Sequence, residues 1–281
     1  MTTLKVGSTR SLLRAVYDQP SVIVSLATIF FIALISAFSP LLFPNPDEID
    51  ASNRLLPPSP EHWFGTDELG RELVARMAHA GQLTLVIALG AMALSIILGV
   101  LWGMLAGSHG WIEEVLMRTA DAIMAVPMIL FALVFVAAFG SSPEVLIVIL
   151  GILKAPLVAR VTRASTMVEL ASDYARGLAV IGLSKGRILF AEILPNVFPV
   201  IVAVATLNIA SAIMIEAALS FIGLGVQPPL ASWGTLLKIG YSLIYQAWWY
   251  ALIPAIAITI VIAAFNDVGK WLERYLDRRV A

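Results

Sequence analysis

Long apolar stretches recur along this chain, and their length is the first indication of its architecture. Six segments consist almost wholly of apolar residues: 21–43, 82–106, 120–139, 143–160, 196–219 and 247–266. A helix that crosses a bilayer needs about 20 such residues, so each segment is long enough, or nearly so, to span a membrane. The pattern predicts an all-α, polytopic membrane protein with six transmembrane helices.

The first apolar segment, 21–43, follows three basic residues, Lys5, Arg10 and Arg14. The apolar core of a secretory signal peptide has only about 7–15 residues. We therefore interpret this segment as an uncleaved transmembrane helix behind a short N-terminal tail.

The fourth segment contains Lys154 and Pro156, and the distribution of basic residues decides whether it spans the membrane. A lysine at mid-membrane costs about 2.5–3.5 kcal/mol on insertion scales. If all six segments span and the N-terminus is cytosolic, 13 of the 18 Lys and Arg residues lie inside, four lie outside and one lies within a span. Removing the fourth span would place the cluster between Arg160 and Arg187 outside. Because basic residues concentrate on the cytosolic side, the sequence favours six spans with both termini in the cytosol.

Composition supports this class and excludes others. Hydrophobic residues make up 59% of the 281 residues and charged residues only 13%, against about 25% charged in soluble domains. The chain has no cysteine, so disulfides and thiolate metal sites are excluded, and its net charge of −1 gives no basic stripe for nucleic acid. A phosphate-binding loop is absent as well, since Gly269-Lys270 is preceded at the required position by Ala264 and followed by Trp271.

The spans divide the chain into parts with expected locations. These are a cytosolic tail (1–20), the first helix (21–43), an extracytoplasmic loop (44–81), a five-helix core (82–266) with a cytosolic loop at 161–195, and a cytosolic C-terminal tail (267–281). The outer loop opens with five prolines in 17 residues, which indicates extended chain. An amphipathic helix is expected over 68–79, with Thr66 or Asp67 as its N-cap.

The cytosolic loop 161–195 has the pattern of two short helices. Small residues at Ala175, Gly177 and Ala179 would let the first helix approach another protein closely. Gly182 is expected to end it, and Ser184 to cap a second helix that finishes before Pro195. This arrangement suits docking of a helix into a groove on a cytosolic partner. The alternative is a basic helical connection that serves topology alone.

Several motifs together resemble those of one family, the dipeptide/oligopeptide/nickel permeases of ABC importers, and specifically its C-type subunit. The cytosolic loop resembles that family's EAA motif, although Arg176-Gly177-Leu178 stands where Glu-Ala-Ala is expected, and Lys270 and Arg278 also depart from the family pattern. The other matching stretches, in the family's order, are His62 to Arg71, Leu116-Met117-Arg118 with Asp121 and Pro127, Ala218 to Pro229, Ser232-Trp233-Gly234, and Ala264-Phe265-Asn266.

The resemblance implies a type I ABC-importer transmembrane fold and a division of labour among subunits. This chain would be a permease without a cofactor of its own, and ATP and Mg²⁺ would bind to two partner ATPase subunits or domains. A B-type permease would complete a heterodimer in the inner membrane, and an extracytoplasmic binding protein would deliver di- or oligopeptides. Nickel, metal chelates or glutathione are the alternative substrates. The residues that would couple to the ATPase lie in 173–185: Asp173, Tyr174, Arg176, Gly177, Gly182, Ser184 and Lys185.

Two further groups of residues have a functional and a structural interpretation. Asp121, Lys154 and Glu216 lie in or near spans, where a charge must face protein or water, so they either line a pathway or pair between helices. A self-sufficient, ion-coupled secondary transporter is the rival class, and Glu216 is its most suitable coupling acid. The segment after the fifth span would form an extracytoplasmic gate or docking surface, or simply a turn; its candidate residues are Gly223, Gly225, Gln227 and Trp233.

Overall fold

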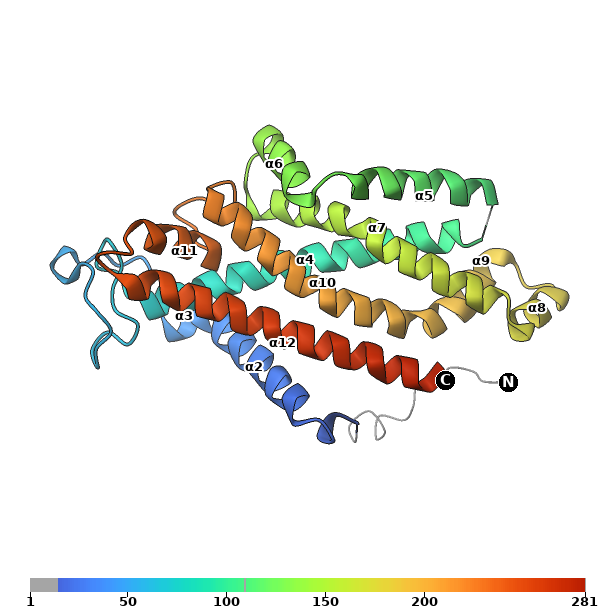
Figure 1. The fold of residues 1–281 in the computed structure, drawn as a ribbon, viewed down its shortest axis with the longest axis horizontal. Coiled ribbons are helices and arrows are strands. Elements are labelled where there is room, and N and C mark those ends of the chain that lie inside the picture. Colours follow the sequence, from blue (N-terminus) through green and yellow to red (C-terminus); the bar gives the residue numbers. More distant parts are fainter. Residues whose placement is uncertain (1–14, 109, 281) are drawn as a thin grey trace.

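The protein is an elongated bundle of helices, seen here in a computed structural model that describes residues 15–108 and 110–280 (Figure 1). Residues 1–14 of the expected tail 1–20 and Ala281 lie outside the described residues, and the rest of the expected tail 267–281 continues helix α12. Within the described part no strand forms, apart from one isolated bridge between Thr66 and Glu72. The helices are α2 (Pro20–Ala37), α3 (Ser39–Leu42), η1 (Ala51–Asn53), α4 (Leu73–Ala106), α5 (Gly110–Ala125), α6 (Met128–Phe139), α7 (Pro143–Leu170), α8 (Asp173–Val180), α9 (Lys185–Arg187), η2 (Ile188–Ile193), α10 (Leu194–Ile222), α11 (Trp233–Ser242) and α12 (Trp248–Val280).

The apolar segments of the sequence become helices long enough to cross a bilayer. Among the described residues, five helical stretches qualify alone, and the bent pair α5–α6 makes a sixth candidate. The fourth predicted span is confirmed and longer than expected, because α7 runs from Pro143 to Leu170 with Lys154 and Pro156 inside it. All-α architecture with five to six spans therefore agrees with the sequence.

The third predicted span, 120–139, is not one straight helix. Helices α5 and α6 meet at an angle of 89° across a short break. Pro127 lies in that break with extended backbone dihedrals. Proline has no N–H for the helical ladder and disfavours helical dihedrals in the residue before it, so the helix stops at Ala125 and restarts at Met128.

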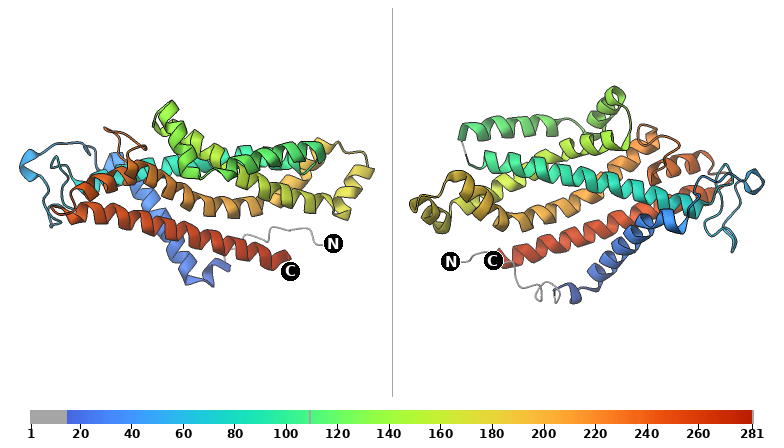
Figure 2. Two further views of the ribbon diagram at one scale, coloured as in Figure 1. Left: turned by 45° about the horizontal axis from the view of Figure 1, so that its top comes forward. Right: turned by 180° about the vertical axis from the view of Figure 1, so that it is seen from behind.

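Helices α4 and α7 form the centre of the bundle and approach each other closely. Glycines on α4 make this possible, since a Cβ atom on Gly103 would lie 2.5 Å from the carbonyl oxygen of Ala159. Helix α10 packs against both members of this pair, and α12 packs on α10, away from α7 (Figure 2). Helix α2 lies outside and diverges from the bundle, although the hydroxyl of Ser25 donates a 2.9 Å hydrogen bond to Asp267 on α12.

The bundle has two distinct ends along its long axis (Figure 1). At one end, here called the α8 end, α8 and α9 connect α7 to α10. At the opposite end, called the α11 end, the segment 44–72 and helix α11 cover the bundle. Any function that requires access from the two sides of a membrane must use these two ends.

Two short helices differ from expectation. The helix expected over 68–79 begins instead at Leu73 and continues without a break to Ala106. Asp67 does not cap it, because its carboxylate accepts hydrogen bonds from the backbone N–H groups of Leu69 and Arg71 and closes a turn there. Likewise, the second helix of the 161–195 loop does not finish before residue 195, since α9, η2 and α10 are continuous from 185 to 222.

Candidate functional site

Helix α8 is defined by the polar and glycine residues at its two ends. The Ser172 hydroxyl accepts a 3.2 Å hydrogen bond from the backbone N–H of Ala175 and caps the N-terminus. Asp173 lies in the first turn, where a carboxylate interacts favourably with the helix dipole. At the other end Gly182 has a φ of +87°, a conformation that favours glycine. The predicted stop at Gly182 is confirmed.

The outer surface of this segment is small and apolar. Val180 is 86% exposed and Ile181 is 72% exposed. The positions that a Cβ would occupy at Gly177, Gly182 and Gly186 face open space. Exposed apolar side chains with unobstructed backbone beside them are typical of a surface that another protein covers.

The inner side of α8 is attached to the segment that leads into α10. Ala175 is buried and belongs to the same apolar cluster as Ile188 and Leu189. The hydroxyl of Tyr174 donates a 2.7 Å hydrogen bond to Glu192, and this bond raises the pKa of Tyr174 above its ordinary value. Arg176 stays outside, where its guanidinium donates to the carbonyl oxygen of Ala171 at 2.8 Å.

Sequence reasoning missed the π-helix η2 that follows. Residues Ile188–Ile193 form one turn and a half of this wider helix, directly before Pro195 in the first turn of α10. Short π-helical segments are frequent at functional sites. The sequence indicated an irregular helix here only through Pro195, which lies next to a continuous apolar pattern. Ser184 precedes α9 as expected, although its side chain forms no capping hydrogen bond.

The three candidate charged residues of the membrane region lie in three different places. Lys154 is 3% exposed, and its ammonium donates to the hydroxyl of Ser211 on α10. Glu216 is fully buried and accepts a 2.7 Å hydrogen bond from Ser220 on the same helix. Within the described residues neither forms an ion pair. Lys154 is held by a hydroxyl on a neighbouring helix and Glu216 by a hydroxyl one turn along its own helix, and neither is open to solvent.

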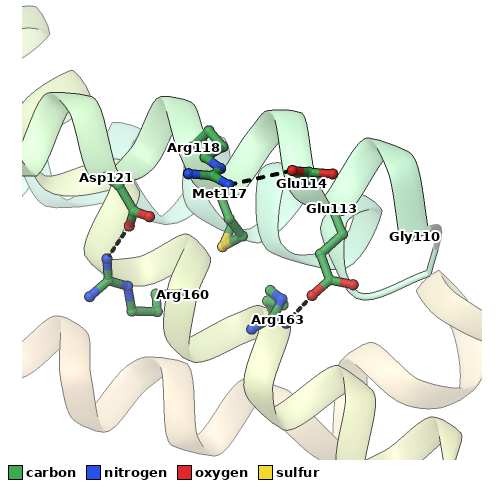
Figure 3. A pocket seen from close by; sticks show the side chains of 8 residues that line it. All are labelled: Gly110, Glu113, Glu114, Met117, Arg118, Asp121, Arg160 and Arg163. Atoms are coloured by element: carbon green, nitrogen blue, oxygen red, sulfur yellow. Dashed lines mark hydrogen bonds and ion pairs between the residues drawn. The ribbon is translucent and has the colours of Figure 1, made fainter.

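Asp121 occurs in a different setting, a polar groove between α5 and α7 near the α8 end. Its carboxylate forms a 2.6 Å ion pair with Arg160 of α7. Glu113 of α5 pairs in the same way with Arg163 of α7, and the two ion pairs bridge α5 and α7 at separate positions along the groove (Figure 3). A third pair, Glu114 with Arg118 at 3.5 Å, lies along α5 itself. The groove has a volume of about 640 Å³.

The candidate gate residues at the α11 end form a compact turn. Gly223 ends α10 with a φ of +91°, and the side-chain amide of Gln227 donates to the carbonyl oxygens of Gly223 and Gly225 at 2.9 and 3.0 Å. Gly225 approaches Ser220 so closely that a Cβ would lie 1.9 Å from the serine hydroxyl oxygen. The turn is therefore fixed against the end of α10.

Trp233 anchors helix α11 and is not available as a docking surface. Only 3% of it is exposed. Its backbone N–H donates to the Thr84 hydroxyl at 3.1 Å, and its indole N–H donates to the carbonyl oxygen of Met77 at 3.0 Å. Both acceptors lie on α4. Ser232 caps α11 in a capping box with Thr235, and the Ser232 hydroxyl also donates to Ser220 at 3.2 Å.

A buried ionic network at the α11 end was also missed by sequence reasoning. Asp67 is fully buried and pairs with Arg71 at 2.6 Å and with Arg76 at 3.4 Å. Glu68 accepts a 2.8 Å hydrogen bond from the hydroxyl of Tyr250 on α12. The network attaches the segment 44–72 to α4 and α12. Its signal in the sequence was the density of charged residues in the stretch from His62 to Arg71.

These features define the class of the protein. A bundle of membrane-length helices, with one projecting helix at one end and a fixed turn at the other, is the architecture of a polytopic membrane protein. The family of binding-protein-dependent transport system inner membrane components matches residues 95–281. The chain belongs to this family, and it is a permease subunit of a transport system and not an enzyme.

Individual relatives resemble most of the chain. It is 36% identical over 260 residues to a dipeptide transport system permease of Alkalihalophilus pseudofirmus, covering 92% of this chain and 86% of the relative. It is 36% identical over 267 residues to a di/tripeptide transport system permease of Pseudomonas aeruginosa, covering 91% and 88%. A probable D,D-dipeptide transport system permease of Escherichia coli K12 is 34% identical over 261 residues, covering 92% and 88%.

Solved structures share the fold at low sequence identity. An inward-facing structure of the MetNI methionine ABC transporter matches with a TM-score of 0.56 and 15% identity, covering 69% of this chain and 93% of that chain. An amino acid ABC transporter crystallised with histidines matches with a TM-score of 0.52 and 18% identity, covering 68% and 90%. The expected transmembrane fold of an ABC importer is therefore confirmed.

Proposed function

We propose that this chain forms half of the transmembrane pathway of an ATP-driven importer of di- and oligopeptides. The observation that carries this proposal is the 36% identity to a dipeptide transport system permease over 92% of the chain. The three relatives named above are all called permeases for dipeptides or for di- and tripeptides. The similarity extends over most of this chain and most of each relative, which supports a shared substrate class.

The α8 end is the side that docks the ATPase subunits, and it faces the cytosol. Support comes from the exposed apolar residues Val180 and Ile181 and from the unobstructed backbone at Gly177 and Gly182. The coupling segment is 173–185. ATP and Mg²⁺ bind to the ATPase partners, because this chain has no phosphate-binding loop.

The α11 end faces the extracytoplasmic side and receives the substrate-binding protein. Aromatic side chains are well exposed there, among them Trp63, Tyr241 and Tyr245. The gate residues Gly223, Gly225 and Gln227 form the turn behind this surface. A B-type permease supplies the second half of the pathway, since the core helices α4 and α7 pack directly against each other within this chain.

Two alternatives give different outcomes in the same assay. Nickel, a metal chelate or glutathione would be carried by the same machinery. Within the described residues no group of three or more His, Cys, Asp or Glu side chains is placed to hold a metal ion. Selectivity for a metal would therefore rest with the binding protein. An ion-coupled transporter would use the acid Glu216, whose carboxylate is buried against Ser220.

The test is uptake by the purified complex in proteoliposomes, with the two permeases, the ATPase subunits and the binding protein present. We expect uptake of a radiolabelled dipeptide that requires ATP and the binding protein. Charge reversal at Arg176, or a bulky residue at Gly182, should lower uptake while ATP hydrolysis continues. Uptake driven by a proton gradient without ATPase subunits would overturn the proposal. ATP-driven uptake of nickel or glutathione, without any uptake of peptides, would show that the proposed substrate is wrong.

A further inference from the structure

The groove between α5 and α7 contains acidic and basic side chains in equal number, where the sequence places the cytosolic edge of the third and fourth spans. Three acidic residues and three arginines line it, and all six are paired with one another (Figure 3): Glu113, Glu114 and Asp121 with Arg163, Arg118 and Arg160. The groove is therefore electrically neutral while remaining strongly polar. Gly110 and Met117 complete its lining.

The groups in this groove are accessible. In the Asp121–Arg160 pair the side chains are 59% and 48% exposed, and in the Glu113–Arg163 pair 28% and 27%. Charged groups on transmembrane helices do not face lipid tails; they face protein or a water-filled cavity. By contrast Lys154, on the same helix α7, is buried and held by a hydroxyl. In the groove, paired charges of α5 and α7 are open to solvent.

The groove also lies close to the segment that moves with the ATPase in the proposed function. Helix α7 carries Arg160 and Arg163 and ends at Leu170, and α8 begins at Asp173. Seven further helical residues, about 10 Å of helix, and a two-residue turn connect Arg163 to α8. A displacement of α8 would therefore be transmitted directly to one wall of the groove.

We propose that this groove lines the inner part of the solute pathway and carries the charged ends of zwitterionic peptides. This inference rests on the proposed function and specifies it further. An incoming ammonium group exchanges with an arginine at Asp121 or Glu113, and an incoming carboxylate exchanges with an acid at Arg160 or Arg163. The volume of about 640 Å³ lies within the range of about 300–1,000 Å³ typical of small-molecule sites.

Exposed ion pairs are weak enough to let a peptide pass through the groove without being retained there. Each such pair contributes only about 0–1 kcal/mol, so replacing one partner by a peptide terminus changes the free energy little. A pathway requires binding that is favourable enough to admit the solute and weak enough to release it. Neutrality matters for the same reason, because an excess charge of either sign would retain one end of the peptide.

The test distinguishes the effect of the groove's net charge from the effect of the ion pair between Asp121 and Arg160. The single variants Asp121→Asn and Arg160→Gln each leave the groove with an excess charge, whereas the double variant restores neutrality without restoring the pair. In the reconstituted complex we expect each single variant to lower the initial rate of dialanine uptake by up to about fivefold, the factor equivalent to about 1 kcal/mol. The double variant should return to within about twofold of the parent rate. Arg54→Gln, the same charge change at an exposed position of the segment 44–72, is the matched control and should leave the rate unchanged.

Each outcome has a distinct meaning. A double variant that is as slow as the single variants, or slower, would show that the pair acts only as a structural link and would overturn this inference. Single variants with the parent rate would overturn it as well. If the parent complex takes up no peptide with ATP, the proposed function itself fails. ATP hydrolysis stimulated by the binding protein, measured in parallel, should stay constant in all variants, since the groove acts on the solute.

Discussion

The hydroxyl of Tyr174 donates a 2.7 Å hydrogen bond to the carboxylate of Glu192, which joins the exposed helix α8 to the π-helix η2. Because η2 continues directly into α10, this bond connects the proposed ATPase-docking helix to a transmembrane span by a route other than the chain itself. Helix α8 is thus joined to the segment before α10 in two ways: through the chain at 181–184 and by this hydrogen bond to η2.

Replacing Tyr174 by phenylalanine should weaken the transmission of movement while leaving the fold intact. We expect the amount of dipeptide taken up per ATP hydrolysed to fall by about two- to fivefold, as measured in proteoliposomes. Tyr245→Phe, at a fully exposed tyrosine near the α11 end, is the control and should not change this ratio. A ratio unaltered by Tyr174→Phe would mean that the hydrogen bond plays no part in coupling.

The pH dependence of this link follows from the same contact. The hydrogen bond raises the pKa of Tyr174 above the ordinary tyrosine value of about 10. A raised pKa means that the bond contributes fully below the unfolded value and is lost only as pH rises through the folded value. The difference in coupling between the parent and Tyr174→Phe should therefore persist unchanged from neutral pH up to about pH 9. A difference that disappears in that range would contradict this account.

Two glycines of the α8 segment should respond oppositely to the same substitution. Both face open space, but only Gly182 has a positive φ. Gly177→Ala should stabilise the helix by about 0.5–1 kcal/mol, whereas Gly182→Ala should cost about 1–2 kcal/mol because an L residue is strained there. Thermal unfolding of the purified subunit in detergent measures both changes. Equal shifts for the two variants would rule out the left-handed conformation at Gly182.

Lys154 and its partner Ser211 offer a test of how the buried charge is tolerated. Ser211→Ala removes the hydroxyl that accepts from the ammonium and should destabilise the subunit by about 1–3 kcal/mol, because a buried donor is left without a partner. Lys154→Met removes the charge itself and should be neutral or stabilising. Unfolding in detergent with increasing denaturant compares them. If Lys154→Met is the more destabilising variant, the lysine has a role beyond packing.

Trp233 should be the most sensitive aromatic residue of the α11 end. Trp233→Phe deletes the indole N–H that donates to Met77, one of the two hydrogen bonds by which Trp233 attaches α11 to α4, and shrinks a buried side chain, which together cost about 1–3 kcal/mol. Trp248→Phe, at an exposed tryptophan, should change stability by less than about 0.5 kcal/mol. A lower melting temperature for Trp233→Phe alone confirms the anchor; equal effects would refute it.

The larger elements of the fold could be predicted from the sequence because they depend on local properties. Apolar length defined the spans, and a glycine able to adopt positive φ predicted the stop at Gly182. Pro127 itself indicated a break, but the apolar segment around it was long enough to be interpreted as one span. The contact of Lys154 with Ser211 had none, since it joins residues 57 positions apart through tertiary packing. The start of α4 at Leu73, in place of residue 68, depends on hydrogen bonds of Asp67 to its own turn, which helix patterning does not reveal.

The central claim is that α8 docks on the ATPase subunit, and disulfide cross-linking tests it most directly. Because the chain has no cysteine, Val180→Cys and Tyr245→Cys each introduce a single thiol, at the α8 end and the α11 end respectively. Each is combined with single cysteines placed along the groove of the ATPase subunit, and the assembled complex is oxidised. The account predicts a cross-link to the ATPase from position 180, altered by ATP, and none from position 245. A cross-link to the ATPase from position 245 and none from position 180 would contradict it.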